Sequence, residues 1–255
     1  MIGMNPSNRL PIIALLLIPA AFGAAMVVVA TRHGIGLSID SVYYICGARE
    51  FAAGRGLTVP FGFSEPRPIG TTWAPLLSII LSLPAQFGFD PIDAAVWLNA
   101  ACFAGFLFLV GYILHRATQS IWLALGGAII IATSHAMLAV HAMAWSEPPF
   151  LLFSTGALML MAEYRRSPSV LKLISAILMI ITSFLTRYAG ASLVLLLMMV
   201  LLSTLRTWRL RLIAVACLLP LGWIPMTPNG PTWMGHIAKT FVGIGSLFDT
   251  TSVQF

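Results

Sequence analysis

Residues 11–30 read PIIALLLIPAAFGAAMVVVA, a run that contains no charged side chain. A helix of this length is about 30 Å long, which matches the hydrocarbon core of a bilayer. A cleavable signal peptide is the alternative, but its apolar core is ordinarily about 7–15 residues. The run is longer than that and lacks a clear small-residue cleavage site. We therefore expect an uncleaved membrane anchor, preceded by Arg9.

The whole chain has the same character. It has 255 residues, of which 59% are hydrophobic and 9% charged, and its mean hydropathy is +0.93. A soluble domain carries about 25% charged residues, so too little polar surface is available here to coat a water-soluble globule. The apolar runs are close to 20 residues and show no period-2 alternation, which favours membrane helices over a β-barrel. We expect an all-α membrane protein, a polytopic bundle of transmembrane helices.

Eight apolar segments follow one another along the chain. They are Pro11–Ala30, Thr72–Phe87, Ala94–Leu114, Ile121–Val140, Pro148–Ala162, Val170–Leu185, Ala189–Leu205 and Leu212–Ile224. The second is short and ends at a proline and a glycine. The side of the membrane on which all later loops lie depends on whether this segment crosses.

The distribution of charge favours a second segment that does not cross. Seven crossings with the N-terminus inside then place eight basic residues and one acid inside, a net charge of +7. Six basic and seven acidic residues lie outside, a net charge of −1. This agrees with the excess of Lys and Arg in cytoplasmic loops. The inside residues are Arg9, Arg116, Glu163, Arg165, Arg166, Lys172, Arg206, Arg209 and Arg211.

This topology predicts one transmembrane domain and an external tail. The domain covers residues 1–226 and includes an external loop, residues 31–93, with helices that lie along the membrane surface. The tail covers residues 227–255. The segments around residues 40, 147 and 187 are then all expected on the external face.

The external loop contains residues 38–44, SIDSVYY, followed by residues 48–57, AREFAAGRGL. The mixture of apolar and charged residues from Asp40 to Ala53 predicts a surface helix, which Gly54 and Gly56 end. Asp40 would lie at or near the helix N-cap, where a carboxylate accepts backbone N–H bonds. Capping alone is one explanation of this acid. A catalytic carboxylate is the other.

Three further strings on the external side carry polar residues. Arg187 lies in residues 185–190, LTRYAG, either as an interfacial side chain that reaches toward water or as a phosphate ligand. Glu147 lies in residues 145–150, WSEPPF, which also read as an ordinary helix start capped by Ser146. Arg67 opens residues 67–77, RPIGTTWAPLL, where a basic interfacial residue is the simpler explanation.

The cysteines and histidines predict neither a disulfide framework nor a metal site. The three cysteines are far apart and odd in number, so they predict neither a disulfide framework nor a metal pair. The histidines are scattered as well. We predict no metal site from them.

The order of these features resembles the C-type (GT-C) glycosyltransferases, in particular the protein mannosyltransferase and aminoarabinose transferase-like family. The resemblance covers about residues 10–205 and rests on the Asp40 loop and the Arg187 turn. In this family an acid of the first external loop serves as base toward the acceptor. The family's common His-Pro-Pro or Tyr-Pro-Pro entry is replaced here by Trp73-Ala74-Pro75. Family members also have many more helices than this chain.

The resemblance implies an inverting glycosyltransferase that takes a sugar from a polyprenyl phosphate. Asp40 would be the base, and substrate contacts would come from Arg187, Glu147, Tyr43, Arg67 and Tyr188. The acceptor would be a glycan, lipid or protein on the external face of a prokaryotic inner membrane, and no nucleic acid is involved. Some members use a divalent metal ion, so the resemblance leaves one open here, with only Asp40 and Glu147 to supply oxygen ligands. The alternatives are a transporter or flippase of lipid-linked substrates, and a truncated, inactive relative with a role in assembly.

Overall fold

A computed structural model of the chain describes residues 9–59, 67–68, 73–204, 207 and 216. In these residues the chain is almost entirely helical, as expected for an all-α protein. The two short strands β1 (Thr58–Val59) and β2 (Arg67–Pro68) pair antiparallel within the external loop. The helices are α1 (Arg9–Ala30), α2 (Ile39–Ala52), α3 (Leu76–Ala85), α4 (Pro91–Thr118), α5 (Ile121–Ala132), α6 (His135–His141), α7 (Glu147–Arg166), α8 (Val170–Thr186), the 3-10 helix η3 (Tyr188–Ala191) and α9 (Ser192–Thr204).

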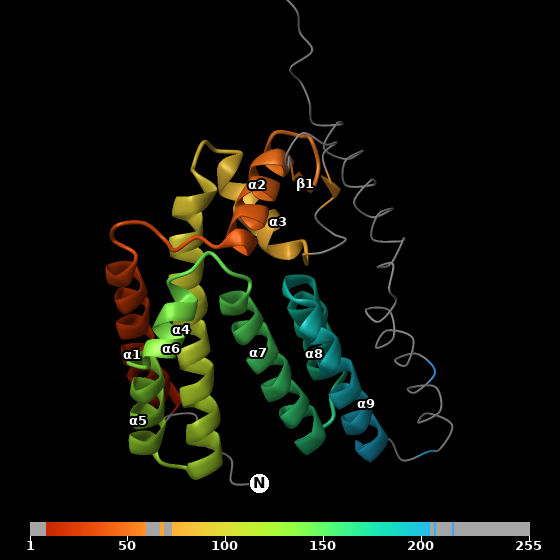
Figure 1. Cartoon of the computed structure of the whole chain (residues 1–255). Helices are drawn as coiled ribbons and strands as arrows, with labels where there is room; N and C mark the ends of the chain where they lie inside the picture. The colour runs from red at the N-terminus through yellow and green to blue at the C-terminus, as the bar shows by residue number, and fades with distance from the viewer. Residues whose placement is uncertain (1–8, 60–66, 69–72, 205–206, 208–215, 217–255) are drawn as a thin grey trace, which may run out of the picture.

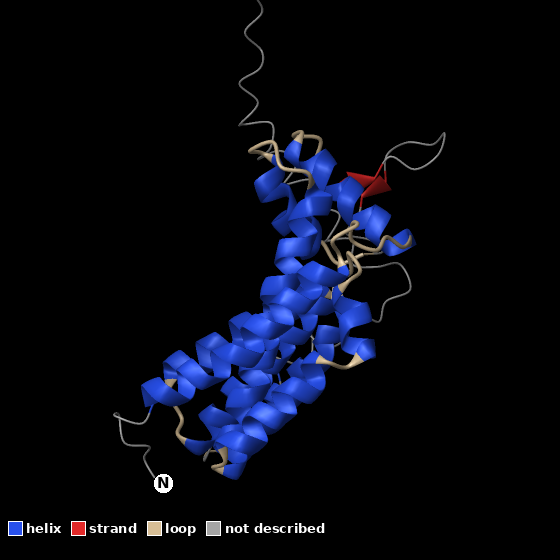
Figure 2. Ribbon diagram, turned by 90° about the vertical axis from the view of Figure 1, so that its left-hand side faces the viewer, coloured by secondary structure: helices blue, strands red, loops and turns tan. Residues whose placement is uncertain are grey.

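The long helices form a bundle, and α2 and α3 lie together at one end of it (Figure 1). We call this the α2 end, and the opposite end, where α4 finishes, the Arg116 end. The segments that follow α1, α6 and α8 all meet at the α2 end. The β1–β2 pair lies at this end too, away from the start of α1 (Figure 2). Segments far apart in sequence are therefore brought to one end of the bundle.

Two helices are long and apolar enough to cross a membrane, Leu10–Ala30 and Pro91–Thr118. A third span is possible by the same criterion if α5 and α6 count as one, although they are bent by 62° at the break between them. These helices indicate a membrane protein. The unbroken span expected over Ile121–Val140 is wrong, because the helix stops at Ala132. The Thr133 hydroxyl donates to the Ile129 carbonyl, 2.9 Å away, and such local bonds compete with helix continuation.

The other apolar helices are shorter or carry charges. Helix α8 has 17 residues, about 26 Å. Helix α7 has 20 residues but includes Glu147, Glu163, Arg165 and Arg166. Lengths and composition thus support two or three spans and not the seven that the sequence suggests. The last expected crossing, Leu212–Ile224, lies outside the described residues except for residue 216, and so does the whole tail 227–255.

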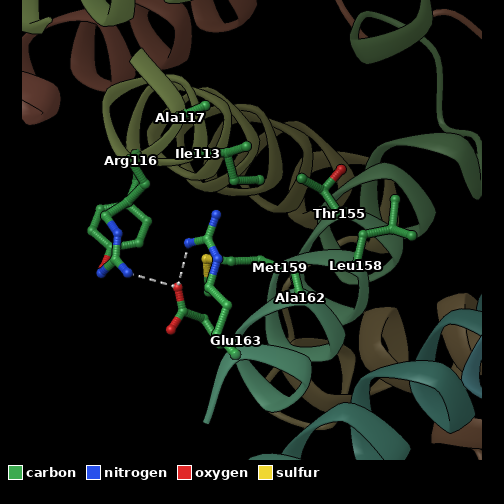
Figure 3. A pocket seen from close by; sticks show the side chains of 10 residues that line it. Ile113, Arg116, Ala117, Thr155, Leu158, Met159, Ala162 and Glu163 are labelled. Carbon is green, nitrogen blue, oxygen red and sulfur yellow. Dashed lines mark hydrogen bonds and ion pairs between the residues drawn. The ribbon is translucent and has the colours of Figure 1, made fainter. Parts of the chain in front are cut away.

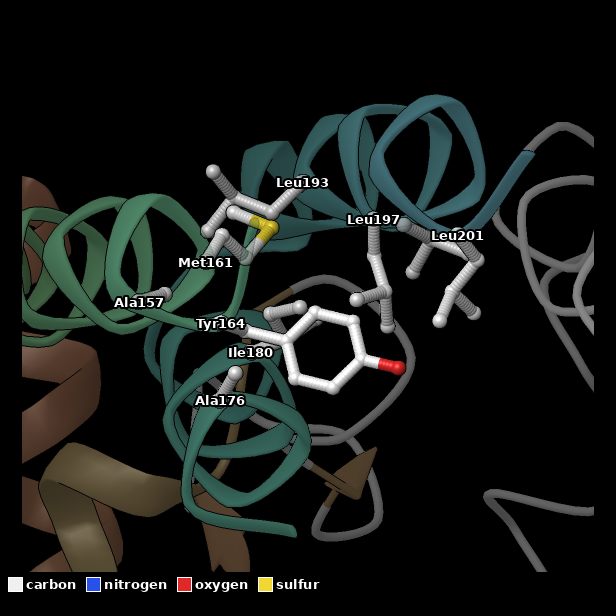
Figure 4. Packing of buried hydrophobic residues seen from close by; sticks show 9 residues of the cluster. Ala157, Met161, Tyr164, Ala176, Ile180, Leu193, Leu197 and Leu201 are labelled. Atoms are coloured by element: carbon white, nitrogen blue, oxygen red, sulfur yellow. The ribbon is translucent and has the colours of Figure 1, made fainter. Parts of the chain in front are cut away.

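Two parts of the core hold the bundle together. In one, Val27 of α1 packs with Phe103 and Leu107 of α4 and Ala132 of α5. In the other, α7, α8 and α9 pack around a buried cluster (Figure 4). Its members include Ala157, Met161, Tyr164, Ala176, Ile180, Leu193, Leu197 and Leu201. This second part fixes the position of the turn between α8 and α9.

Helix α3 is too short to span a bilayer by itself. Its ten residues extend about 15 Å, half of a bilayer core. Its buried side chains Leu77 and Leu81 pack against Tyr44, Ile45 and Ala48 of α2. The apolar residues of α3 thus cover α2 at one end of the bundle.

Candidate active site

Asp40 lies in the first turn of α2, but it is not the N-cap. The cap is Ser38, whose hydroxyl accepts from the Ser41 N–H at 3.4 Å. Ser41 Oγ accepts in return from the Ser38 N–H at 3.0 Å. Trp145 Nε1 donates to Ser38 Oγ at 2.7 Å and ties α2 to the start of α7. Asp40 is thus near the N-cap, as expected, but Ser38 and Ser41 make the capping bonds in its place.

The Asp40 carboxylate instead contacts Trp73. The indole Nε1 donates to Asp40 Oδ1 at 3.0 Å. The Trp73 ring stacks on Tyr43, with centroids 3.5 Å apart and planes at 17°. The Tyr188 hydroxyl donates to the Trp73 carbonyl oxygen at 3.3 Å. Trp73 thus connects the first turn of α2 with the turn after α8.

Tyr44 occupies the centre of this region. Only 5% of it is exposed, and its hydroxyl donates to Ser146 Oγ at 3.2 Å. Ser146 was expected to cap α7, but its side chain makes no capping bond. Its hydroxyl accepts from Tyr44 instead, which explains the difference.

The pKa of the Tyr44 phenol is shifted by burial and by the charged residues near it. Burial raises the pKa of the Tyr44 phenol, and the negative charges of Asp40 and Glu147 raise it further. The Ser146 hydrogen bond and the positive charge of Arg187 lower this pKa. Three charged residues from three separate segments therefore lie within electrostatic reach of one phenol.

Arg187 and Glu147 form an ion pair between the end of α8 and the start of α7. Arg187 sits in extended backbone, with φ −150° and ψ 134°, where α8 stops and η3 begins. The two side chains are 39% and 31% exposed. An exposed pair of this kind contributes about 0–1 kcal/mol. Its main consequence is positional, because it holds the guanidinium at the α2 end.

Tyr188 follows directly and is partly buried. Burial raises the pKa of its phenol to about 12, and neighbouring Tyr44 adds to the shift. Tyr188 therefore stays protonated at neutral pH and can serve as a hydrogen-bond donor. Its ring also packs at a tilt on Phe184, with centroids 5.6 Å apart.

Of the expected site residues, Asp40, Tyr43, Glu147, Arg187 and Tyr188 lie together at the α2 end. With Tyr44, Trp73 and Ser146 they make up what we call the polar cluster. Arg67 is in β2, opposite Val59, and its side chain lies outside the described part of the structure. Its expected contact with substrate stays a prediction.

Sequence analysis missed the contributions of Trp73 and Tyr44. Trp73 is noticeable in sequence only as a departure from a family pattern, yet it links three segments of the cluster. A tryptophan in a short turn beside Pro75 is a weak signal for a site. Tyr44 adjoins Tyr43, and a helix places neighbours on different faces: Tyr43 faces Trp73 while Tyr44 faces the core.

The side chains of the polar cluster determine which chemistry it can perform. It contains two carboxylates and one guanidinium, with aromatic walls. In the described residues, no three His, Cys, Asp or Glu side chains come close enough to hold a metal ion. A carboxylate can accept a proton from a hydroxyl, and a guanidinium can bind phosphate through two parallel N–H bonds.

Comparisons with models of protein families, with curated proteins and with solved structures found no match. Any assignment of function therefore depends on the residues and their geometry.

Proposed function

We propose that this chain is an inverting glycosyltransferase that moves a sugar from a polyprenyl phosphate to an acceptor at the polar cluster. The observation that carries the proposal is that Asp40, Glu147 and Arg187 lie at one end of the bundle, joined by the Trp73–Asp40 and Tyr188–Trp73 hydrogen bonds and the Arg187–Glu147 ion pair. These residues come from α2, α7 and the turn after α8. A general base and a phosphate ligand on one end of a bundle with membrane-length helices fit a substrate that is lipid at one end and sugar at the other.

In the proposed reaction the acceptor hydroxyl oxygen attacks the anomeric carbon of the donor. The bond between that carbon and the phosphate oxygen breaks, and its electron pair leaves with the lipid phosphate. The hydroxyl proton passes to an Asp40 carboxylate oxygen. Phosphate is a good leaving group, so a single carboxylate is enough, in contrast to glycoside hydrolases with their pair of carboxyl groups. A single displacement inverts the configuration of the sugar.

Two contacts prepare Asp40 for this role. The Trp73 indole holds one carboxylate oxygen at 3.0 Å and leaves the second oxygen for the acceptor. The Ser38 cap takes over the backbone N–H groups that would otherwise compete for the carboxylate. The Trp73 contact fixes the orientation of the Asp40 carboxylate.

Arg187 is the proposed ligand of the donor phosphate. Its partner Glu147 holds the guanidinium in place before substrate arrives. A guanidinium has five N–H donors, so it can keep one carboxylate contact and still bind phosphate oxygens. Tyr188, whose hydroxyl donates to the Trp73 carbonyl oxygen, fixes Trp73 beside Asp40 at this site.

The proposed topology is multi-pass with the N-terminus inside. We propose that the α2 end faces the outside of a prokaryotic inner membrane and that seven segments cross. The charge difference between the two sides supports this orientation. The segments after α1, α6 and α8 meet at one end (Figure 1), which supports placing them on the same side of the membrane. The crossings assigned to α7, α8 and α9 would need neighbouring helices to cover their shorter or charged portions.

The test is transfer of radiolabelled sugar from polyprenyl phosphates by membranes that contain the full chain. Membranes with an empty vector are the control. We expect chain-dependent labelling of a glycan, lipid or protein acceptor. If labelled lipid phosphate instead changes sides of the membrane without any transfer, the chain is a transporter and the proposal is wrong.

A further inference from the structure

A second site lies at the Arg116 end, far from the polar cluster. A cavity of about 270 Å³ opens between α4 and α7 there. It is lined by side chains of both helices (Figure 3). The cavity is slightly smaller than the ~300–1,000 Å³ typical of sites for drug-sized ligands. It can thus hold part of a larger amphipathic molecule.

The cavity exists because α4 and α7 diverge. Nearer the α2 end they touch closely: a Cβ added at Gly105 would lie 2.9 Å from Leu152 Cδ1. From this contact α7 slopes away from α4 toward the Arg116 end (Figure 1). The gap therefore widens toward the Arg116 end.

The rim of the cavity is positively charged. Arg116 Nη2 and Arg166 Nη1 both contact Glu163 Oε1, at 3.0 and 3.4 Å. Arg116 Nη1 also donates to the Tyr112 hydroxyl at 3.3 Å. Two guanidiniums share one carboxylate oxygen, which leaves a net charge of +1 and N–H groups able to bind another acceptor. The carboxylate keeps the two like charges close together.

The wall of the cavity is apolar. In Figure 3, Leu158 lies on the side of the cavity away from the Arg116–Glu163 contact, and Ile113 and Met159 lie between the two. Leu158 is 43% exposed. The charged and apolar parts are therefore separated along one groove, in the same order as the headgroup and acyl chain of a lipid.

We propose that this groove binds one anionic phospholipid of the leaflet at the Arg116 end. The phosphate would bridge Arg116 and Arg166. The part of one acyl chain nearest the headgroup would lie against Ile113, Leu158 and Met159. A guanidinium matches phosphate oxygens through two parallel N–H bonds. An anionic headgroup neutralises the net +1 of the rim, whereas a zwitterionic lipid does not. The apolar wall favours a lipid over a soluble phosphate. The proposal is independent of the sugar-transfer proposal, since no residue is shared.

The test is lipid binding by the purified full chain in detergent, followed by native mass spectrometry. The probes are dioctanoyl phosphatidylglycerol and dioctanoyl phosphatidylcholine. We expect one tightly bound phosphatidylglycerol and much weaker binding of phosphatidylcholine. Arg166→Gln should weaken phosphatidylglycerol binding by about tenfold, the effect of losing one charge-assisted contact.

Arg165→Gln is the matched control, because Arg165 is exposed on the same helix but does not line the cavity. It removes the same charge from a neighbouring position and should leave the affinity within about twofold. If both variants lose affinity equally, only general electrostatic attraction is at work and the site is disproved.

A second variant tests the apolar wall without changing charge. Ala162 lines the groove and is exposed, so Ala162→Trp fills the groove at little cost to folding. This variant should lose phosphatidylglycerol binding, and excess inorganic phosphate should not displace the lipid from the wild-type chain. Undiminished binding by Ala162→Trp, or displacement by inorganic phosphate at the lipid's own concentration, would show a simple anion site and overturn the proposal.

Discussion

At the residue scale, the polar cluster depends on side chains that orient one another. Asp40 is held by Trp73, Trp73 by Tyr43 and Tyr188, and Arg187 by Glu147. Each contact joins different segments of the chain. Conservative substitutions can therefore separate the role of a single atom from the role of the fold.

Trp73→Phe removes the indole donor but keeps an aromatic ring for stacking on Tyr43. Asp40 then loses the contact that fixes its orientation. We expect the transfer rate to fall about tenfold, the order of one net hydrogen bond of roughly 1–1.5 kcal/mol. Transfer by membranes at matched expression is the measurement. Trp122→Phe, at a position 80% exposed on α5, is the control and should retain wild-type activity.

Arg187→Lys keeps the charge but loses the two parallel N–H bonds. An interfacial residue would tolerate this change, whereas a phosphate ligand would not. We expect the apparent affinity for a short-chain polyprenyl phosphate to fall roughly ten- to a hundredfold, corresponding to about 1.5–3 kcal/mol. Arg49→Lys is the control, because Arg49 pairs with Asp90 away from the cluster. Equal affinities of wild type and Arg187→Lys would assign Arg187 to the interface alone.

At the element scale, the turn after α8 positions two residues of the cluster. Helix η3 lies tightly against the end of α8: a Cβ added at Gly190 would lie 2.6 Å from the Phe184 backbone nitrogen. Backbone atoms cannot move aside as a flexible side chain can. Glycine at position 190 is therefore needed for the close approach that places Arg187 and Tyr188.

Gly190→Ala should push η3 away from α8 and displace both residues. We expect a loss of transfer together with a stability loss of about 1–3 kcal/mol, as for an overpacked site. Unfolding in detergent monitored by circular dichroism measures the second effect. Gly126→Ala is the control, since a Cβ at Gly126 meets nothing within 4 Å, and alanine favours a helix by about 0.5–1 kcal/mol. A Gly190→Ala protein as stable and active as wild type would show that this contact is unimportant.

Sequence alone accounts for part of these elements. The length of the apolar runs and their lack of alternation predict helices, and the structure has them. Asp40, Glu147 and Arg187 stand out because charges are rare in such a chain. Ser38 and Ser41, three positions apart, are a sequence signal for the cap that the structure shows. Asp40 lies between them and is an equally common capping residue, so sequence alone does not distinguish the two. The contact of Trp73 with Asp40 joins residues 33 positions apart, and local patterns carry no information on such pairs.

At the scale of the whole molecule, the number of crossings is the least predictable feature. Hydropathy marks apolar runs but not where a helix breaks, as at Thr133, or whether its length is enough to span. Charges inside an apolar helix such as α7 lower its hydropathy, yet a neighbouring helix can compensate for them. The cavity between α4 and α7 also arises only from the angle between two helices, which no sequence pattern records.

Topology can be measured directly by cysteine labelling. In a background in which the native cysteines are replaced, Ser120→Cys and Ser167→Cys should be labelled only from the inside. The motivation is the net +7 against −1 charge across the proposed membrane. A membrane-impermeant maleimide applied to intact cells, with and without permeabilisation, distinguishes the two sides. External labelling of either position would reverse the proposed orientation and place the polar cluster inside.

The measurement that tests the central claim most directly is sugar transfer by Asp40→Asn. Asparagine keeps the size of the side chain and can still accept from the Trp73 indole, but it cannot take the acceptor proton. General base catalysis contributes about 10²–10⁴-fold, so we predict that transfer falls by at least about a hundredfold while membrane insertion is unchanged. Asp93→Asn, an exposed acid in the first turn of α4, should retain full activity. Wild-type transfer by Asp40→Asn would contradict the assignment of Asp40 as the base.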